Sequence, residues 1–190
     1  MTANTAALEF LAARRSASPK LMSAPAPDRA QLTELLALAS RVPDHGMLVP
    51  WRFIVLTEAA LRRLGGDIRA TGARLGVDPA ALEKACAVYA TSPLAVAVIA
   101  SPKGSEKIPA IEQQLAVGGV CLSLVNAALA SGWAAGWVTG WAAHEAEYLP
   151  RLLDLSAGEY IAGLVHIGTA AAPSERPRPD VTALTSWLEA

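Results

Sequence analysis

The stretch QQLAVGGVCLSLVNAALASGWAAGWVTGWAAH, residues 113–144, contains no Asp, Glu, Lys or Arg. Three of the five tryptophans lie in this charge-free segment, and each directly follows a glycine: Trp133, Trp137 and Trp141. A segment this long and apolar either crosses a membrane or lies in the centre of a large core, because about 20 apolar residues suffice to span a bilayer. The choice between these two structures decides the class of protein.

Three features of the charge-free segment favour a buried core. It contains polar side chains that a lipid-facing helix would have to satisfy internally, among them Asn126 and Thr139. No basic cluster flanks it to set a membrane orientation. Its first part is rich in Ala, Leu and Val, whereas the glycines and Trp-Val-Thr of its second part favour a strand. We expect a helix that is apolar on all sides, hence buried, ending near Gly132 and followed by a short buried strand.

The composition of the whole chain predicts a single soluble domain. The 190 residues are enough for one domain with a substantial core. Charged residues make up 17% of the chain, which indicates that a core or a second subunit covers much of the surface. The net charge of −1, without a basic block, gives no sign of nucleic-acid binding. The amino terminus lacks a signal-peptide pattern, so we expect a cytoplasmic protein with no membrane partner.

The cysteines and histidines do not form a disulfide or metal pattern. Cys86 and Cys121 are far apart and read as small core residues in a reducing compartment. None of the three histidines has a second ligand at metal spacing, so no metal site is expected. His166 is interpreted as a core or interface residue. A triad built on Asp44 and His45 lacks the nucleophile elbow that would support it.

Periodicity and capping signals predict four strands separated by about six helices. The expected strands are Trp51–Thr57, Leu94–Ala100, a short one after Gly132, and Tyr160–Gly168. The expected helices cover residues 3–13, a segment capped by Asp28 with Gln31, residues 58–70 after Thr57, a segment starting at Asp78 and Pro79, the first part of the charge-free segment, and residues 145–153. This order predicts an α+β or α/β layered domain.

The segment Arg14-Arg15-Ser16 at the end of the first helix carries candidate binding chemistry. Two guanidinium groups and a hydroxyl at a helix–loop junction suit a phosphate, because arginine offers planar, permanently charged donors. Basic residues at a helix carboxyl end equally complement the helix dipole. From this segment alone the two interpretations remain open.

An ordered set of motifs over about residues 6–188 identifies a resemblance. The set comprises Arg14-Arg15-Ser16-x-Ser18, Arg41-x-Pro43-Asp44-His45, Pro50-Trp51, Gly136-Trp137-x-Thr139-Gly140, and a strand ending in Gly168-Thr169. In this order it resembles the FMN-dependent nitroreductase family, and within it the compact YdjA-type branch. The resemblance implies a three-layer α+β fold, with a central, mainly antiparallel sheet flanked by helices. It also implies one domain over residues 1–190, an entwined homodimer, and a tail of about residues 169–190 that packs on the partner subunit.

The resemblance implies FMN sites at the subunit interface, with NADH or NADPH as the reductant. The residues implied to hold FMN are Arg14, Arg15 and Ser16 at the phosphate, Trp137, Val138 and Thr139 along the flavin, Arg41 and His45 toward the FMN of the partner, and Arg178, beside Arg176, near the phosphate. Two positions depart from the pattern. Val138 stands where the compact branch commonly has arginine, which puts phosphate or nicotinamide binding there in question. Val49 stands where many relatives have glutamine.

The activity implied by the resemblance is that of a flavin oxidoreductase. Hydride would pass from NAD(P)H through flavin N5 to a nitroaromatic, quinone or similar electron-poor acceptor in a ping-pong cycle. The cofactor carries this chemistry, so no catalytic side chain is expected, although Arg41 is a candidate cation for the reduced flavin. The alternatives are a non-catalytic dimeric protein that binds flavin or another planar ligand, a small membrane protein, and a related flavin chemistry on the same fold.

Overall fold

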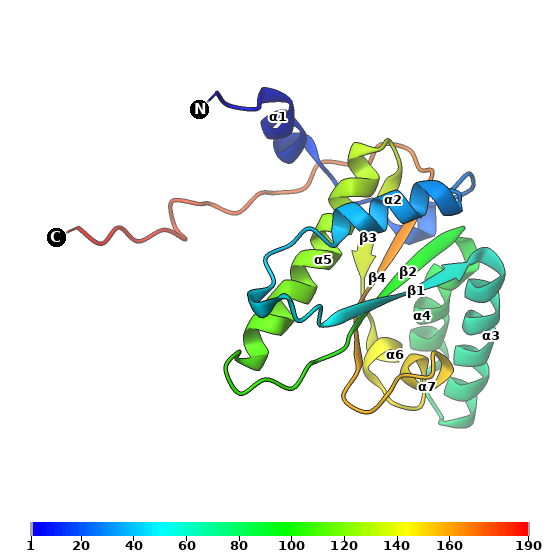
Figure 1. The fold of residues 1–190 in the computed structure, drawn as a ribbon. Coiled ribbons are helices and arrows are strands. Elements are labelled where there is room, and N and C mark those ends of the chain that lie inside the picture. Colours follow the sequence, from blue (N-terminus) through cyan, green and yellow to red (C-terminus); the bar gives the residue numbers. More distant parts are fainter. Residues whose placement is uncertain (1, 190) are drawn as a thin grey trace.

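A four-stranded antiparallel sheet forms the middle layer of the protein in the computed structural model, which describes residues 2–189 (Figure 1). Its strands are β1 (Trp51–Thr57), β2 (Leu94–Ala100), β3 (Ala134–Val138) and β4 (Tyr160–Gly168), in the order β1-β2-β4-β3. Every neighbouring pair is antiparallel. The predicted bounds of β1, β2 and β4 are therefore confirmed, as is the expected three-layer α+β architecture.

One face of the sheet is covered by α2 (Arg29–Ala39) and α5 (Ala110–Ala130) (Figure 1). On α5, Val117, Val120 and Leu124 recur at helical spacing and are almost completely buried. They pack with Val96 and Val98 of β2, which point to this face because side chains alternate along a strand.

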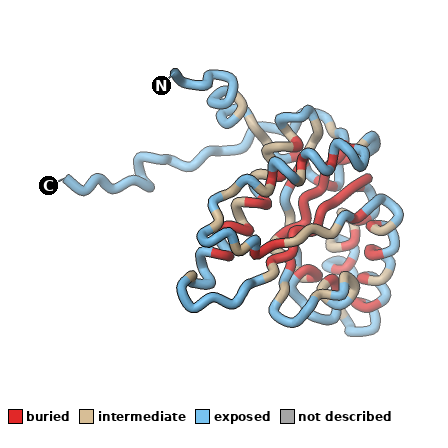
Figure 2. The backbone as a smooth tube through the Cα atoms, viewed as in Figure 1, coloured by how far each residue is buried: buried red, intermediate tan, exposed pale blue. Residues whose placement is uncertain are grey.

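The opposite face is covered by α3 (Glu58–Arg74), α4 (Pro79–Thr91), and two short helices, α6 (Trp141–His144) and α7 (Leu149–Leu152). Leu61, Leu64 and Ile68 form the buried stripe of α3. They share a core with Ile99 of β2 and Leu164 of β4. Figure 2 shows the result as a buried sheet between helices with exposed outer faces.

The helix starts follow the capping signals of the sequence. Asp28 and Gln31 form the expected capping box at the start of α2. The side chains of Thr57 and Asp78 accept hydrogen bonds from the first turns of α3 and α4. These predictions are confirmed because a cap is a local interaction within four residues.

One expectation about the helices is wrong. Residues 145–153 do not form one helix, since Glu145 is extended and ends α6, and α7 covers only Leu149–Leu152. The helix α5 packs one face on the sheet, and Leu115 on another face is 68% exposed in the single chain. Burial of this second face requires a second subunit and stays a prediction. Among the described residues, α5 alone is long and apolar enough to cross a membrane, but its buried face packs on the sheet.

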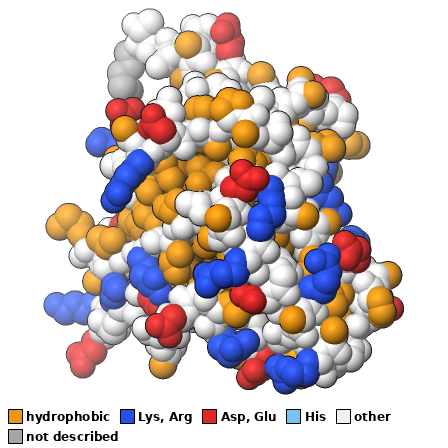
Figure 3. Space-filling view, turned by 90° about the vertical axis from the view of Figure 1, so that its right-hand side faces the viewer, with side chains coloured by type: hydrophobic (Ala, Val, Ile, Leu, Met, Phe, Trp, Pro, Cys, Tyr) orange, Lys and Arg blue, Asp and Glu red, His pale blue; other side chains and the backbone are white. Residues whose placement is uncertain are grey.

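The two ends of the chain project from the same side of the body (Figures 1 and 2). The first helix, α1 (Thr5–Ala13), has no buried residue. The tail that follows β4 is exposed from residue 171 to residue 189, and Trp187 near its far end is 85% exposed. Elsewhere, hydrophobic side chains gather in a broad patch bordered by charged ones on the face seen in Figure 3. Much apolar surface therefore remains uncovered in the single chain.

Candidate functional site

A hollow of about 420 Å³ lies beside β3, the edge strand, where the start and the end of the chain meet. We call it the arginine cleft. Its lining residues are Arg14, Arg15, Ser16, Ala17, Ser18, Pro19, Gly136, Trp137, Val138, Ser174, Arg176 and Arg178. The structure thus brings together seven residues that the sequence had marked from three distant segments: Arg14, Arg15, Ser16, Trp137, Val138, Arg176 and Arg178.

The first basic segment reaches the cleft by pairing with the edge of β3. The backbone N–H of Ala17 donates to the carbonyl oxygen of Ala135 at 2.9 Å. Gly136 permits this approach, because a Cβ atom there would lie 2.3 Å from the carbonyl oxygen of Ala17. A paired bridge between Ser23 and Thr169 then fixes the segment to the residue that follows β4.

The same contact determines which backbone groups of β3 face the cleft. In an antiparallel strand the N–H and C=O groups of one residue point to the same side, and the side alternates. Since Ala135 directs its carbonyl away from β4, Trp137 directs its backbone groups away from β4 as well. The Trp137 indole donates to the carbonyl oxygen of Ala162 at 3.3 Å and lies across Gly163. The open edge of β3 therefore offers backbone hydrogen-bonding groups to a ligand.

The guanidinium groups of the arginine cleft retain donors for an anion. The Nη2 atom of Arg14 donates to the Ser16 hydroxyl at 3.1 Å. The Nε atoms of Arg14 and Arg15 are buried and have no hydrogen-bond partner among the described residues. A buried charged donor without a partner is costly, and an anion such as a phosphate placed against the same guanidinium groups in the cleft would offset this cost. Glu175 already pairs with Arg15, and this contact lowers the pKa of the Glu175 carboxyl.

A second hollow of about 440 Å³ adjoins the arginine cleft, and Val138 lines both. We call it the lysine hollow. Its remaining lining residues are Lys20, Ala81, Lys84, Ala85, Val88, Tyr89, Thr139, Gly140, Trp141, Ala142, Ala143 and Leu164. Most of this lining is apolar, and the indole of Trp141 is held edge-on against the ring of Tyr148, with ring centroids 4.5 Å apart. The hollow suits a planar apolar group that continues from the arginine cleft.

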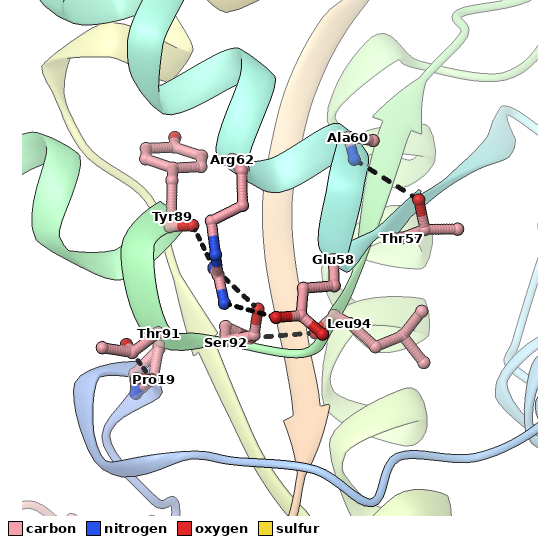
Figure 4. A network of polar contacts seen from close by, with 9 residues as sticks. All are labelled: Pro19, Thr57, Glu58, Ala60, Arg62, Tyr89, Thr91, Ser92 and Leu94. Atoms are coloured by element: carbon pink, nitrogen blue, oxygen red, sulfur yellow. Dashed lines mark hydrogen bonds and ion pairs between the residues drawn. The ribbon is translucent and has the colours of Figure 1, made fainter.

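A polar network holds the walls of the lysine hollow together (Figure 4). Arg62 of α3 donates to the carbonyl oxygen of Tyr89 at 2.6 Å and to Glu58 at 2.8 Å, and so caps the carboxyl end of α4. At the same end, the Thr91 hydroxyl donates to the carbonyl oxygen of Pro19 at 3.2 Å. Pro19 begins the 3-10 helix η1 (Pro19–Leu21), which carries Lys20 and packs on α4.

Arg41 and His45 lie outside the arginine cleft of their own chain, in the loop between α2 and β1. Arg41 is exposed, and His45, in the 3-10 helix η2 (His45–Met47), places Nδ1 2.7 Å from Glu112 Oε2 at the start of α5. Met47 and Val49 in this loop have positive φ angles of 50° and 47°, which side chains disfavour. The expected contact with the partner's cofactor stays a prediction.

The structure adds site residues that the sequence did not indicate. Lys20 follows Ser16 by four residues, so its nearness to the phosphate motif was a usable signal. Lys84 enters the lysine hollow from α4, and no local pattern marks it. Trp141 enters from α6; the Gly-Trp pattern of the charge-free segment includes it but did not assign it to the site. Glu175 pairs with Arg15 across 160 residues of sequence. Such contacts depend on the tertiary fold.

Comparisons with known proteins agree with this arrangement. Residues 11–169 match the sequence profile of the nitroreductase family. The chain is 33% identical over 127 residues to YdjA of Escherichia coli K12, provisionally named an NAD(P)H nitroreductase, covering 67% of this chain and 68% of the relative.

Solved structures share the fold over the full length. A nitroreductase-like family protein from Bacillus cereus superposes with a TM-score of 0.81 at 20% identity, covering 100% of both chains. A provisionally named nitroreductase from Desulfovibrio desulfuricans, in complex with FMN, gives a TM-score of 0.72 at 20% identity over 97% of this chain and 96% of that one. The family profile covers most of the chain, and with it the arginine cleft up to Val138, so this protein belongs to the nitroreductase family.

Proposed function

We propose that the protein is an FMN-dependent NAD(P)H oxidoreductase that reduces nitroaromatic, quinone or similar electron-poor acceptors. The observation that carries the proposal is the junction at Val138 of a cationic cleft and an apolar hollow beside an open strand edge. A ligand with an anionic group at one end and a planar ring system at the other matches this pair of hollows. FMN is such a ligand, and a solved structure of the same fold contains it.

The phosphate end of FMN would be held in the arginine cleft. Arg14 and Ser16 are already joined by a hydrogen bond, so their donors are arranged together before the ligand binds. Arg176 and Arg178 approach from the tail. Charge-assisted hydrogen bonds of this kind are about twice as strong as neutral ones. Arg15 would also bind the phosphate once Glu175 no longer pairs with its guanidinium.

The ring system would lie along Trp137, Val138 and Thr139 and enter the lysine hollow. Trp137 would contribute backbone groups from the open edge of β3. The apolar lining around Val138 would exclude water from the ring. FMN supplies the hydride chemistry, taking hydride from NADH or NADPH and passing it to the acceptor. The side chains of this protein would bind, orient and shield, and none is needed as an acid or base.

The exposed apolar surface supports a homodimer as the functional unit. Leu115 of α5, Leu11 of α1 and Trp187 of the tail are 68%, 58% and 85% exposed in the single chain. A monomeric protein seldom leaves apolar surface of this extent uncovered, which favours packing against a second subunit. In such a dimer, the loop with Arg41 and His45 would reach the FMN of the partner, and the tail would pack on the partner. A dimer of this kind would be cytoplasmic.

A second candidate function is a dimeric flavin-binding protein without turnover. This candidate is favoured by Val138, which stands where the compact branch commonly has arginine, and by the lining of the two hollows, which contains no Asp, Glu or His among the described residues. Rapid mixing of the FMN-loaded protein with NADH and with NADPH separates the two. Reduction with at least one of them at a rate that keeps pace with steady-state turnover supports the oxidoreductase. Slow reduction with both supports the binding protein.

The proposal is tested by titrating the protein with oxidised FMN and following flavin fluorescence. The double variant Arg14→Ala/Arg15→Ala should bind FMN at least tenfold more weakly, because each charge-assisted hydrogen bond contributes roughly 1.5–3 kcal/mol. Arg63→Ala, an exposed arginine of α3 that does not line the cleft, is the matched control and should bind normally. Unchanged affinity of the double variant would return these arginines to a helix-capping role.

A further inference from the structure

Two lysines from different elements stand in the lining of the lysine hollow without an acidic neighbour there. Lys20 lies on η1 and Lys84 on α4, and no Asp or Glu of the part of the chain that the structure describes lines this hollow. Of the four lysines of the chain, only Lys103 donates a hydrogen bond through its ammonium among the described residues. The acid beside Lys84 in sequence, Glu83, is paired instead with Arg69 at 2.7 Å. The hollow therefore carries two unpaired positive charges on an apolar surface.

The fold holds together the two elements that carry Lys20 and Lys84. The helix η1 packs on α4, and Thr91 near the end of α4 bonds to Pro19, the residue before Lys20. Arg62 caps the same end of α4 through the carbonyl oxygen of Tyr89, a residue of the hollow (Figure 4). Because both elements are joined at this point, Lys20 and Lys84 border the same hollow.

The position of the lysine hollow indicates which part of the ligand Lys20 and Lys84 would contact. With the phosphate in the arginine cleft, a ring system that passes Val138 enters the lysine hollow. The apolar lining receives the ring, while ammonium groups favour carbonyl oxygens and ring nitrogens. Oxidised flavin is neutral in its ring, whereas two-electron reduction adds negative charge to the same polar edge. A fixed cation next to a site where charge develops stabilises the charged form selectively.

We propose that Lys20 and Lys84 bind the polar edge of the flavin and make the protein hold reduced FMN more tightly than oxidised FMN. This inference rests on the proposed flavin function. It assigns the charge-stabilising role to two lysines of the same chain, in place of Arg41 of the partner. The two lysines are thereby cofactor-contacting residues that set the reduction potential of the bound flavin.

The test compares Lys20→Gln, Lys84→Gln and the double variant with wild type and with Lys107→Gln. Lys107 lies in the exposed loop before α5, outside the hollow, and its replacement makes the same change in charge. Affinity for oxidised FMN comes from fluorescence titration, and the midpoint potential of bound FMN comes from equilibration with a reference dye. The two together give the ratio of the dissociation constants for oxidised and reduced FMN.

The double variant should lose roughly tenfold in this ratio, as expected for two partly exposed charge interactions. For a two-electron couple, a tenfold change corresponds to a shift of about 30 mV to a more negative potential. Affinity for oxidised FMN should change much less, and Lys107→Gln should match wild type in both measurements.

Three results would overturn the assignment, and they differ in what they reject. If the double variant binds oxidised FMN normally and its midpoint potential is unchanged, the role of the two lysines is rejected but the proposed flavin function stands. If the affinities for oxidised and reduced FMN fall by the same factor, the lysines bind the cofactor without favouring its reduced form. Failure of wild-type protein to bind oxidised FMN rejects the proposed function, and this inference falls with it.

Discussion

The Nη2 atom of Arg15 lies 2.5 Å and 2.6 Å from the two carboxylate oxygens of Glu175. The Nη1 atom of Arg15 also donates to the carbonyl oxygens of Ala12, Ala13 and Arg14 at the end of α1. Arg15 therefore joins the first helix to the tail, and a carboxylate occupies the outer side of its guanidinium. Two arginines adjacent in sequence thus have different roles, since Ser16 is the only side-chain hydrogen-bond partner of Arg14 within residues 2–189.

The Arg15–Glu175 pair predicts that Glu175 competes with a bound phosphate. Glu175→Gln removes one negative charge from the rim of the arginine cleft and releases Arg15. FMN should bind roughly two- to fivefold more tightly at low ionic strength, and the gain should shrink at high salt. Fluorescence titration at two salt concentrations measures this. Glu106→Gln, in an exposed loop away from the cleft, is the control. Weaker binding would instead mean that the pair positions Arg176 and Arg178.

The close contact at Gly136 predicts that FMN binding is lost when the segment Arg14–Ala17 can no longer approach β3. A Cβ atom in Gly136→Ala would lie 2.3 Å from the carbonyl oxygen of Ala17, so the segment must move away from β3. We expect FMN affinity to fall at least tenfold and stability to fall by roughly 1–3 kcal/mol. Gly66→Ala is the control, because Gly66 lies in α3 and a Cβ atom there would meet nothing within 4 Å. If Gly136→Ala binds FMN normally, the contact between Ala17 and β3 is not needed for FMN binding.

The contact between Arg52 and Glu159 predicts loss of stability in strong acid. Arg52 donates from Nε at 2.8 Å and from Nη2 at 2.6 Å, which lowers the pKa of Glu159 to about 2. Because this folded pKa lies below the unfolded value of about 4.5, the stabilisation is present above pH 4.5 and is lost as the pH falls through 2.

Glu159→Gln should remove this acid dependence and lower stability at pH 7 by roughly 1–2 kcal/mol, as expected for a bidentate charged contact. Urea unfolding between pH 7 and pH 2 measures both effects. An unchanged acid profile in the variant would show that Arg52 and Glu159 do not stabilise the fold.

His166 predicts a second loss of stability, at milder pH. It is fully buried in β4, and neither ring nitrogen has a hydrogen-bond partner among the described residues. Burial disfavours the charged ring and lowers the His166 pKa from about 6.5 to about 4. The unfolded chain therefore binds the proton more readily, so stability is complete above pH 6.5 and falls as the pH drops to 4.

The size of the His166 effect should be roughly 3 kcal/mol between pH 7 and pH 4. His166→Leu, which has no titrating group, should flatten the pH dependence in this window while leaving the lower one, due to Glu159, in place. Urea unfolding at intermediate pH values measures the slope. A slope equal to that of wild type would mean that His166 is solvated or paired in solution.

The sequence predicted the elements whose signals are local. The caps at Asp28, Thr57 and Asp78 and the apolar run of β2 involve neighbouring residues, and their positions are confirmed. Arg14 and Val138, which the resemblance marked from distant segments, line one cleft.

The features that the sequence missed depend on contacts between distant segments. Lys84 lies at the site because α4 packs beside η1. The residues next to Lys84 in the sequence do not predict this packing. The pairing of Glu175 with Arg15 likewise requires the tail to return to the start of the chain. The split of residues 145–153 is an exception, because Pro150 is a local signal that the prediction did not use: it disfavours a helix interior and lies in the first turn of α7.

The visible spectrum of the purified, FMN-loaded protein under anaerobic conditions tests the central claim most directly. We predict a yellow protein whose flavin absorbance is bleached by NADH or NADPH and restored by a nitroaromatic or a quinone. A protein that stays colourless after incubation with excess FMN and gel filtration would contradict the account.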